Sequence, residues 1–200
     1  MVPGLLVGER RDRFEQLYRD YSGLVLGYAL RRTEGPHDAA DVVAEVFVVV
    51  WRRLDDVPPG DDARLWLYVV ARNTLANHIR GHRRRDRLTA RAGAGLDGFA
   101  AALPADRGID REPIAAALAA LGPADRDVLG LVGWEGLDHA EAAVVLGCTR
   151  ATLRVRLHRA RRRFARQLRD RGVEVPQRSA AAGHELAGWA LADPDEEGAT

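Results

Sequence analysis

The segment that most constrains the fold of this chain is the arginine-rich stretch 148–171, CTRATLRVRLHRARRRFARQLRDR. It holds ten Arg and one Asp. Apolar side chains nevertheless recur in it at three- and four-residue steps, which places them on one side of a helix. This stripe predicts a helix that packs on a protein core and presents cations outward. Its members are Leu153, Leu157, Ala160, Phe164 and Leu168.

The residues before this helix predict a tight turn and another helix. The stretch LDHAEAAVVLGCTRATL reads as helix, turn at 147–149 and helix, with Asp138 and Thr149 as N-caps. Ala143 is small at the point where two crossing helices would approach closely. This is the pattern of a helix-turn-helix, whose second helix enters the major groove of DNA. We therefore predict duplex DNA binding, in preference to a merely solvated charged helix.

The outward face of the arginine helix carries the groups that such binding needs. Arg pairs bidentately with guanine, and small apolar groups meet the methyl group of thymine. Arginines nearer the C-terminal end of the helix would contact phosphates. The predicted duplex-binding residues are Arg150, Ala151, Thr152, Arg154, Val155, Arg156, Arg159 and Arg162.

Helical periodicity also runs through the rest of the chain. One stretch, 46–50, consists of β-branched and aromatic residues that favour a strand locally. We predict a helix there as well, because no hairpin turn flanks it and the sequence on both sides is helical in type. The fold class predicted is all-α. Helices are expected at 9–33, 37–56, 61–85, 113–121, 124–132, 138–146 and 150–171.

The distribution of glycine, proline and charge predicts two small domains. Residues 88–112 are rich in Ala and Gly, contain Pro104 and read as a flexible linker, which would span roughly 30 Å. They separate a domain at 9–87 from a helix-turn-helix domain at 113–171. The remaining tail, 172–200, carries six acids against one Arg. We leave open whether the tail is a disordered end, a short helix or an autoinhibitory cover for the basic helix.

Three segments together resemble one protein family. LDHAEAAVVLGCTRATLRVRLHRARRRF is similar to the promoter-reading C-terminal module of bacterial RNA polymerase sigma factors, above all the extracytoplasmic-function group. DAADVVAEVFVVVWRRL resembles their helix that docks on core polymerase, and WLYVVARNTLANHIRGHRRR resembles their helix that reads and melts the −10 element. The resemblance covers roughly residues 10–170. The chain departs from the family pattern at Ala44 (usually Gln), Asn77 (commonly Asp) and Val155 (commonly Ser).

This resemblance implies a function and its residues. The implied protein binds core RNA polymerase and promoter DNA and helps to open chosen promoters, with the helix-turn-helix on the −35 element. An anti-sigma factor is a further expected partner. The implied polymerase-binding residues are Asp41, Glu45, Phe47, Trp51 and Arg52, with the alternative that Phe47 and Trp51 are core. The implied residues for −10 recognition and melting are Arg64, Trp66, Arg72, Asn73, Asn77, Arg80, Arg83 and Arg84.

Other classes of protein fit the sequence less well. A single Cys148 excludes an internal disulfide framework and favours a reducing cytoplasm. The longest apolar run, 42–51, is too short to span a bilayer and contains Glu45, so we expect neither membrane insertion nor, from the N-terminal sequence, a signal peptide. His78 and His82 lack a third ligand, and no catalytic constellation is evident. We therefore expect no metal, no cofactor and no enzyme activity.

Two other functions remain open from the residues alone. The main alternative is a dimeric helix-turn-helix regulator that binds duplex DNA without polymerase. The other is an interaction module whose arginines bind an acidic protein. Co-purification with core polymerase separates the first alternative from a sigma factor, and function without DNA would favour the second.

Overall fold

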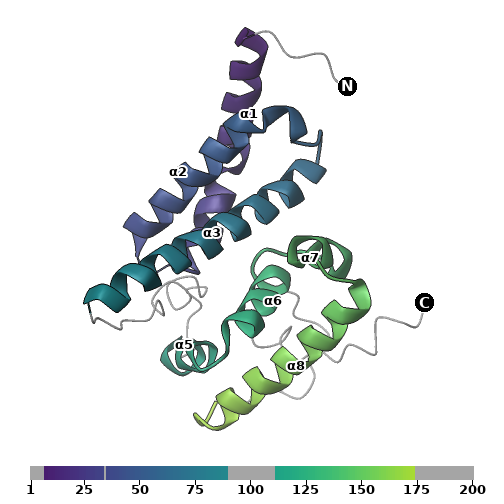
Figure 1. Ribbon diagram of the computed structural model, residues 1–200. Coiled ribbons are helices and arrows are strands. Elements are labelled where there is room, and N and C mark those ends of the chain that lie inside the picture. The colour runs from purple at the N-terminus through teal and green to yellow at the C-terminus, as the bar shows by residue number, and fades with distance from the viewer. Residues whose placement is uncertain (1–6, 34, 90–110, 174–200) are drawn as a thin grey trace, which may run out of the picture. The chain divides into compact units, whose positions relative to one another are not determined.

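The computed structural model describes residues 7–33, 35–89 and 111–173, and for residues 7, 81–89 and 111 it describes the backbone alone. All regular elements in these ranges are helices (Figure 1), which confirms the predicted all-α class. The chain divides into two compact units, Met1–Ala102 and Leu103–Thr200, and each is described separately below. The predicted linker and acidic tail lie almost wholly outside the described residues.

The first unit is built from three helices that pack on one another. The second of them contains the segment 46–50, which is rich in β-branched residues. Pro36 opens that helix after an extended Gly35, because proline needs no hydrogen-bond partner at the first turn. The valines Val42, Val46 and Val50 follow at four-residue steps and are fully buried. Their burial on one face explains why the segment is helical, as predicted. The elements are α1 (Val7–Leu30), α2 (Pro36–Arg52), a 3-10 turn η1 (Leu54–Asp56) and α3 (Asp62–Thr89).

One sequence expectation for this unit, the end of its second helix, is wrong in detail. The predicted helix 37–56 ends at Arg52, because the chain turns inward there to bury Leu54 and Val57. On α3, the buried face includes Val70. The sequence alone did not identify the buried face, because apolar residues surround much of α3 and its contacts with α1 and α2 select which of them are covered. The buried residues are Ala63, Leu67, Tyr68, Val70, Ala71, Thr74 and Leu75.

The second unit is organised around the arginine-rich helix, which packs against the three helices before it. Its apolar stripe is buried as predicted: no residue from Leu153 to Leu168 in the stripe is more than 4% exposed. The stripe therefore anchors one side of this helix in the core and leaves its other side outward. No described helix has an apolar stretch long enough to cross a membrane. The elements are α5 (Arg111–Ala119), α6 (Pro123–Gly133), α7 (His139–Leu146) and α8 (Arg150–Arg169).

Candidate nucleic-acid and protein interfaces

The first helix of the predicted helix-turn-helix, α7, begins with a capping box. Asp138 Oδ1 accepts hydrogen bonds from the backbone N–H groups of Ala140 (2.7 Å) and Glu141 (2.8 Å). Glu141 Oε2 in return accepts from the N–H of Asp138 at 2.9 Å. The backbone N–H of Glu141, and then that of Ala140, lower the pKa of Asp138, because they stabilise its ionised form. The predicted cap is thus confirmed.

A left-handed glycine makes the turn between α7 and α8. Gly147 has φ 62° and ψ 40°, a conformation that glycine adopts without a side-chain clash. The N–H of Cys148 donates to the carbonyl of Ala143 at 3.0 Å, which closes the end of α7. Thr149 Oγ1 then accepts from the N–H of Thr152 at 3.1 Å and caps α8. These local bonds fix where α8 starts and in which direction it leaves α7.

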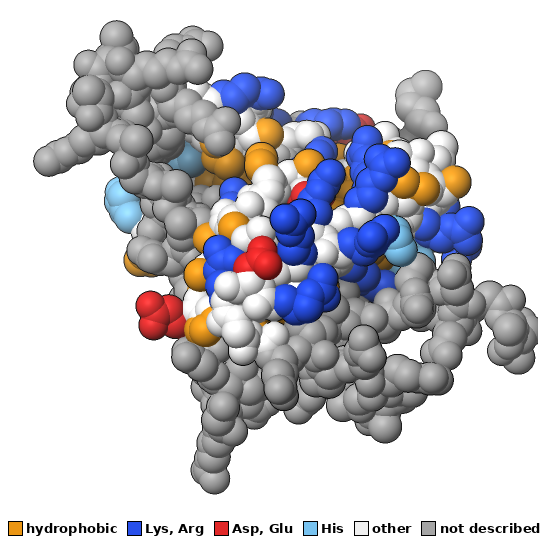
Figure 2. All heavy atoms as spheres, turned by 90° about the horizontal axis from the view of Figure 1, so that it is seen from below, with side chains coloured by type: hydrophobic (Ala, Val, Ile, Leu, Met, Phe, Trp, Pro, Cys, Tyr) orange, Lys and Arg blue, Asp and Glu red, His pale blue; other side chains and the backbone are white. Residues whose placement is uncertain are grey.

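The residues predicted for duplex binding lie on the side of α8 that is not buried. Seven of the eight are exposed, and Val155 retains 50% exposure although it is apolar. Thr152 is half-buried, with its hydroxyl 2.8 Å from that of Thr149. Figure 2 shows Arg side chains crowding the face of the molecule that α8 helps to form. The surface therefore offers guanidinium groups and small apolar groups together.

One arginine of α8, Arg163, forms an ion pair with a residue of another helix. Its Nη1 lies 2.7 Å from Oδ2 and 3.0 Å from Oδ1 of Asp125, in the first turn of α6. The carboxylate of Asp125 is only 14% exposed. Arg163 thus holds α8 to α6. Arginine count and helical position alone do not reveal this role, because the partner lies on another helix.

The exposed side of α2 carries four of the five residues predicted to bind a protein partner. Asp41, Glu45, Trp51 and Arg52 are exposed, and Trp51 keeps 43% exposure. Phe47 is the exception: it is 4% exposed, so the expectation that it offers a docking surface is wrong. The physical reason is that α1 covers it, with the rings of Phe14 and Tyr18 against the Phe47 ring.

An aromatic cluster between α1 and α2 supports the exposed Trp51. Its ring meets Phe14 of α1 nearly edge-on at 5.2 Å between centroids, and Phe47 meets Phe14 in the same way at 6.1 Å. Tyr18, also on α1, contacts Phe47 at 4.7 Å and is itself 47% exposed. The cluster thus joins a buried ring to two rings that remain accessible to a partner.

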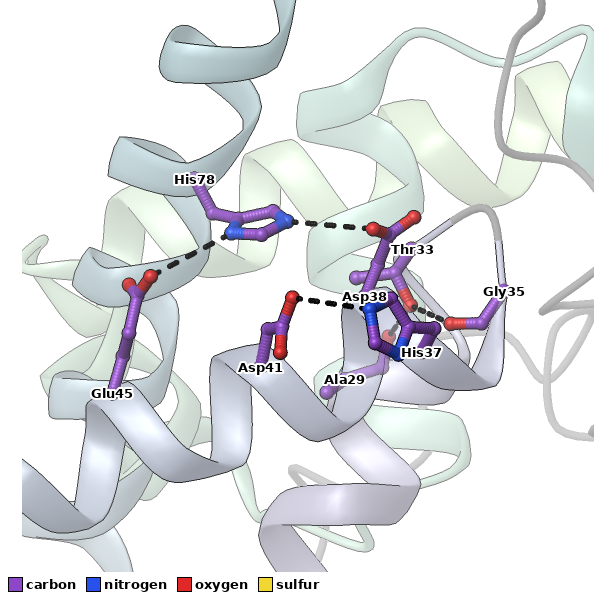
Figure 3. A network of polar contacts seen from close by, with 8 residues as sticks. All are labelled: Ala29, Thr33, Gly35, His37, Asp38, Asp41, Glu45 and His78. Carbon is purple, nitrogen blue, oxygen red and sulfur yellow. Dashed lines mark hydrogen bonds and ion pairs between the residues drawn. The ribbon is translucent and has the colours of Figure 1, made fainter.

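Polar contacts connect α2 to α3 around His78 (Figure 3). The imidazole lies with Nδ1 3.9 Å from Glu45 Oε1 and Nε2 4.0 Å from Asp38 Oδ1, and only 9% of it is exposed. On α2, His37 lies 3.9 Å from Asp41. Within the described part of the chain, no group of three or more His, Cys, Asp or Glu side chains could hold a metal ion. The contacts therefore link the candidate docking helix to the candidate strand-binding helix.

The residues predicted for single-strand binding lie along α3. Asn73, Asn77 and Arg80 are exposed, and Arg80 donates to the amide oxygen of Asn77. Arg64, Trp66 and Arg72 are half-buried. Arg83 and Arg84 belong to α3, but their side chains lie outside the described residues.

Trp66 has a neighbour that the sequence prediction did not include. The guanidinium carbon of Arg53 lies over the indole ring, 5.7 Å from its centroid. Arg53 Nε also donates to Asp56 Oδ2 at 2.9 Å. Nothing in the run WRRLDD distinguishes Arg53 from Arg52, so only the fold identifies this contact.

Comparisons with known proteins match both units. Residues 17–85 match the family model Sigma-70 region 2, and residues 111–164 match the model Sigma-70, region 4. The chain is 32% identical over 160 residues to the ECF RNA polymerase sigma factor SigL of Mycobacterium tuberculosis, covering 78% of this chain and 89% of SigL. It is 33% identical over 164 residues to the ECF RNA polymerase sigma factor BldN of Streptomyces coelicolor, covering 80% of this chain and 61% of BldN.

Two solved structures share the fold. CnrH, solved in complex with the cytosolic domain of CnrY, aligns with a TM-score of 0.56 and 29% identity over 78% of this chain and 88% of that one. The sigma factor RpoE, solved in complex with the anti-sigma factor NepR from Bartonella quintana, aligns with a TM-score of 0.62 over 78% of this chain and 96% of that one. Its identity of 21% makes this second likeness one of fold alone.

Proposed function

Because this chain belongs to the extracytoplasmic-function group of bacterial RNA polymerase sigma factors, we propose that its two units divide polymerase docking and promoter recognition between them. It directs core RNA polymerase to specific promoters and helps to initiate transcription there. The division assigns core polymerase and the −10 element to the first unit. It assigns the −35 element to the second.

The observation that carries this proposal is the two-sided character of α8. Leu153, Leu157 and Phe164 hold the helix in the core, while Arg159 and Arg162 remain exposed. Such a helix can enter a major groove without unfolding any part of its unit. We assign the −35 contacts to Arg150, Ala151, Thr152, Arg154, Val155, Arg156, Arg159 and Arg162.

Core polymerase binding is assigned to the exposed side of α2. Asp41, Glu45, Trp51 and Arg52 combine charge with one accessible aromatic ring, as protein interfaces commonly do. Phe47 supports this surface from beneath by its contact with Phe14, and we exclude it from direct docking.

Recognition of the opened −10 strand is assigned to α3. Trp66 offers a ring on which a base can stack, and Asn73 and Asn77 offer amide groups to base edges. The cations of this helix would follow the phosphates of the strand. They are Arg64, Arg72, Arg80, Arg83 and Arg84.

The proposed domains are 9–87 and 113–171, with a linker at 88–112 and an acidic tail at 172–200. A linker of that length would reach roughly 30 Å when flexible. Binding of one domain would then raise the effective concentration of the other at its own promoter element. This explains how two small surfaces can select one promoter.

We extend the proposal to partners, activity and location. An anti-sigma factor is a further partner, because RpoE, which shares the fold, was solved with one. The chain acts without catalysis of its own, since sigma factors are not enzymes. It works in the cytoplasm, where a single reduced Cys148 is stable.

A reconstituted transcription assay tests the proposal. The full chain is added to core RNA polymerase on a library of genomic fragments, and the 5′ ends of the transcripts are mapped. We expect transcripts from a set of promoters that share two elements, and none from core polymerase alone. Duplex binding by the chain without core, with no transcripts in its presence, would instead favour a polymerase-independent regulator.

A further inference from the structure

We propose that Arg53 is a further residue of the single-strand-binding surface, where it positions the Trp66 ring and contacts the phosphate next to the base stacked on that ring. This inference rests on the proposed role of Trp66 in binding the −10 strand. Arg53 lies outside all three sets of residues assigned above. Its neighbour Arg52 is assigned to polymerase instead.

The backbone places Arg53 where α2 ends and the chain turns toward α3. Its N–H donates to the carbonyl of Val49 at 2.9 Å, the last bond of α2, and its own φ and ψ (−114° and 29°) are no longer helical. The 3-10 turn that follows buries Leu54 and so fixes the direction of the chain. As a result, the Arg53 side chain extends over Trp66, one turn inside α3, and stays 57% exposed.

The chemistry of the pair suits a nucleic-acid strand. A planar guanidinium above an indole is attracted by the ring, and its edges still carry donors for a phosphate. The Arg53 side chain donates to Asp56 through Nε at 2.9 Å and is 57% exposed, so its two terminal nitrogens can donate to a phosphate. The phosphate of a nucleotide whose base stacks on Trp66 would lie beside the ring, where a neighbouring cation can follow the strand. The same cation can therefore orient the ring and hold the strand.

Two adjacent acids provide a matched pair for the test. Asp56 binds Arg53, whereas Asp55 binds Arg10 of α1 at 2.5 Å. Their carboxylates are equally accessible, at 56% and 55% exposed. Each substitution removes one negative charge from nearly the same place, so the long-range electrostatic effect on a nucleic-acid strand is similar. Only the substitution at Asp56 releases Arg53. A difference between the two variants therefore reports on Arg53 itself.

The first experiment measures how holoenzyme, the full chain with core polymerase, binds a labelled single strand. The strand carries the −10 element of a promoter found in the transcription assay. We expect Arg53→Ala to weaken binding several-fold and to reduce the slope of log affinity against log salt by about 0.7, the contribution of one single-strand phosphate contact. Arg53→Lys should restore the slope, but only part of the affinity, because an ammonium is not planar. Unchanged affinity and slope for Arg53→Ala overturn the inference.

Trp66→Ala separates this inference from the proposed function. If Trp66→Ala leaves strand binding unchanged, the role of Trp66 fails, and the inference fails with it. If Trp66→Ala weakens binding and Arg53→Ala does not, only the inference is lost. Melting temperatures of all variants are compared with the parent, so that a loss of fold is not mistaken for a loss of contact.

The second experiment uses the two acids. Asp56→Asn should raise strand affinity roughly twofold to fivefold, the size of an exposed ion pair, because phosphate no longer competes with the carboxylate. The same substitution in an Arg53→Ala background should have no such effect. An equal rise for Asp55→Asn, or a rise that persists without Arg53, contradicts the inference.

Discussion

Arg163 of α8 and Asp125 of α6 form the ion pair that ties the arginine-rich helix to its unit, with Nη1 2.7 and 3.0 Å from the two carboxylate oxygens. Arg163 directly follows Arg162, the last of the predicted DNA-binding residues, in the C-terminal half of α8. The pair joins this part of α8 to the first turn of α6. Arg163 thus differs in role from its neighbour Arg162, which is exposed on the outward face.

Removing the pair should lower stability and leave the outward arginines in place. We expect Asp125→Ala to lower the free energy of unfolding by about 1 kcal/mol, because the pair is only partly buried. Arg162→Ala should leave that free energy within about 0.5 kcal/mol of the parent and weaken duplex binding instead. Urea denaturation and duplex titration of both variants measure the two effects. A stability loss for Arg162→Ala equal to that for Asp125→Ala would contradict the distinction.

Arg159 should contribute to promoter affinity and not to polymerase affinity. We expect Arg159→Ala to weaken binding of the full chain to a duplex with the −35 element by about tenfold, the loss of one arginine contact to a base. Arg169→Ala is the matched control, because it lies about 15 Å further along the same helix and is also exposed. Binding to core polymerase should be the same for both. Equal losses of duplex affinity would assign the effect to net charge alone.

Substitutions of Trp51 and Phe47 should have different effects, although the two residues lie one turn apart on α2. The first should mainly affect polymerase binding and the second mainly stability. Phe47→Ala removes a buried ring and should lower the free energy of unfolding by about 3 kcal/mol or more. Trp51→Ala removes a ring that is 43% exposed, so we expect a smaller loss of stability and a clear loss of affinity for core polymerase. Denaturation and polymerase pull-down of the two variants check this. Normal polymerase binding by Trp51→Ala would remove it from the docking surface.

Much of the second unit follows from its sequence because its signals are local. The Asp138 cap, the left-handed Gly147 and the Thr149 cap each depend on residues within a turn or two of one another, and the apolar stripe of α8 repeats at steps of three and four residues. Such signals determine helix ends and a buried side without knowledge of the neighbours. The same locality explains why the unit could be recognised as a helix-turn-helix.

The sequence predictions are wrong where contacts between helices determine a helix end or the burial of a side chain. Arg52 ends α2 without glycine or proline, because Leu54 must reach the core. Phe47 is buried and Trp51 is not, although both are aromatic and share a helix, because α1 covers only one of them fully. The contacts of Arg53 and Arg163 were missed for the same kind of reason. Their partners are distant in sequence or cannot be told apart from other acids by sequence. The assignment of residues to DNA and polymerase remains a prediction.

Gly147 should be replaceable by asparagine with less damage than by alanine. Its φ of 62° lies in the left-handed region, and no atom lies near the position that a Cβ would take, so only backbone strain opposes a side chain. We expect Gly147→Ala to lower the free energy of unfolding by about 1 kcal/mol. Gly147→Asn should lower it less, because asparagine tolerates this conformation. Equal losses, measured by urea denaturation, would show that a contact and not strain constrains the position.

Asp138 should make the second unit sensitive to acid through its helix cap. Hydrogen bonds from Glu141 and Ala140 hold its pKa below the ordinary value of 3.8. A group whose pKa is lower in the folded state stabilises the fold fully above its unfolded pKa and loses that contribution as pH falls through the folded pKa. We therefore expect the parent to lose more stability below pH 3.8 than Asp138→Asn, whose amide oxygen can cap α7 without titrating. Urea denaturation of both proteins from neutral pH downward measures the difference, and parallel curves would show that other carboxylates account for the loss.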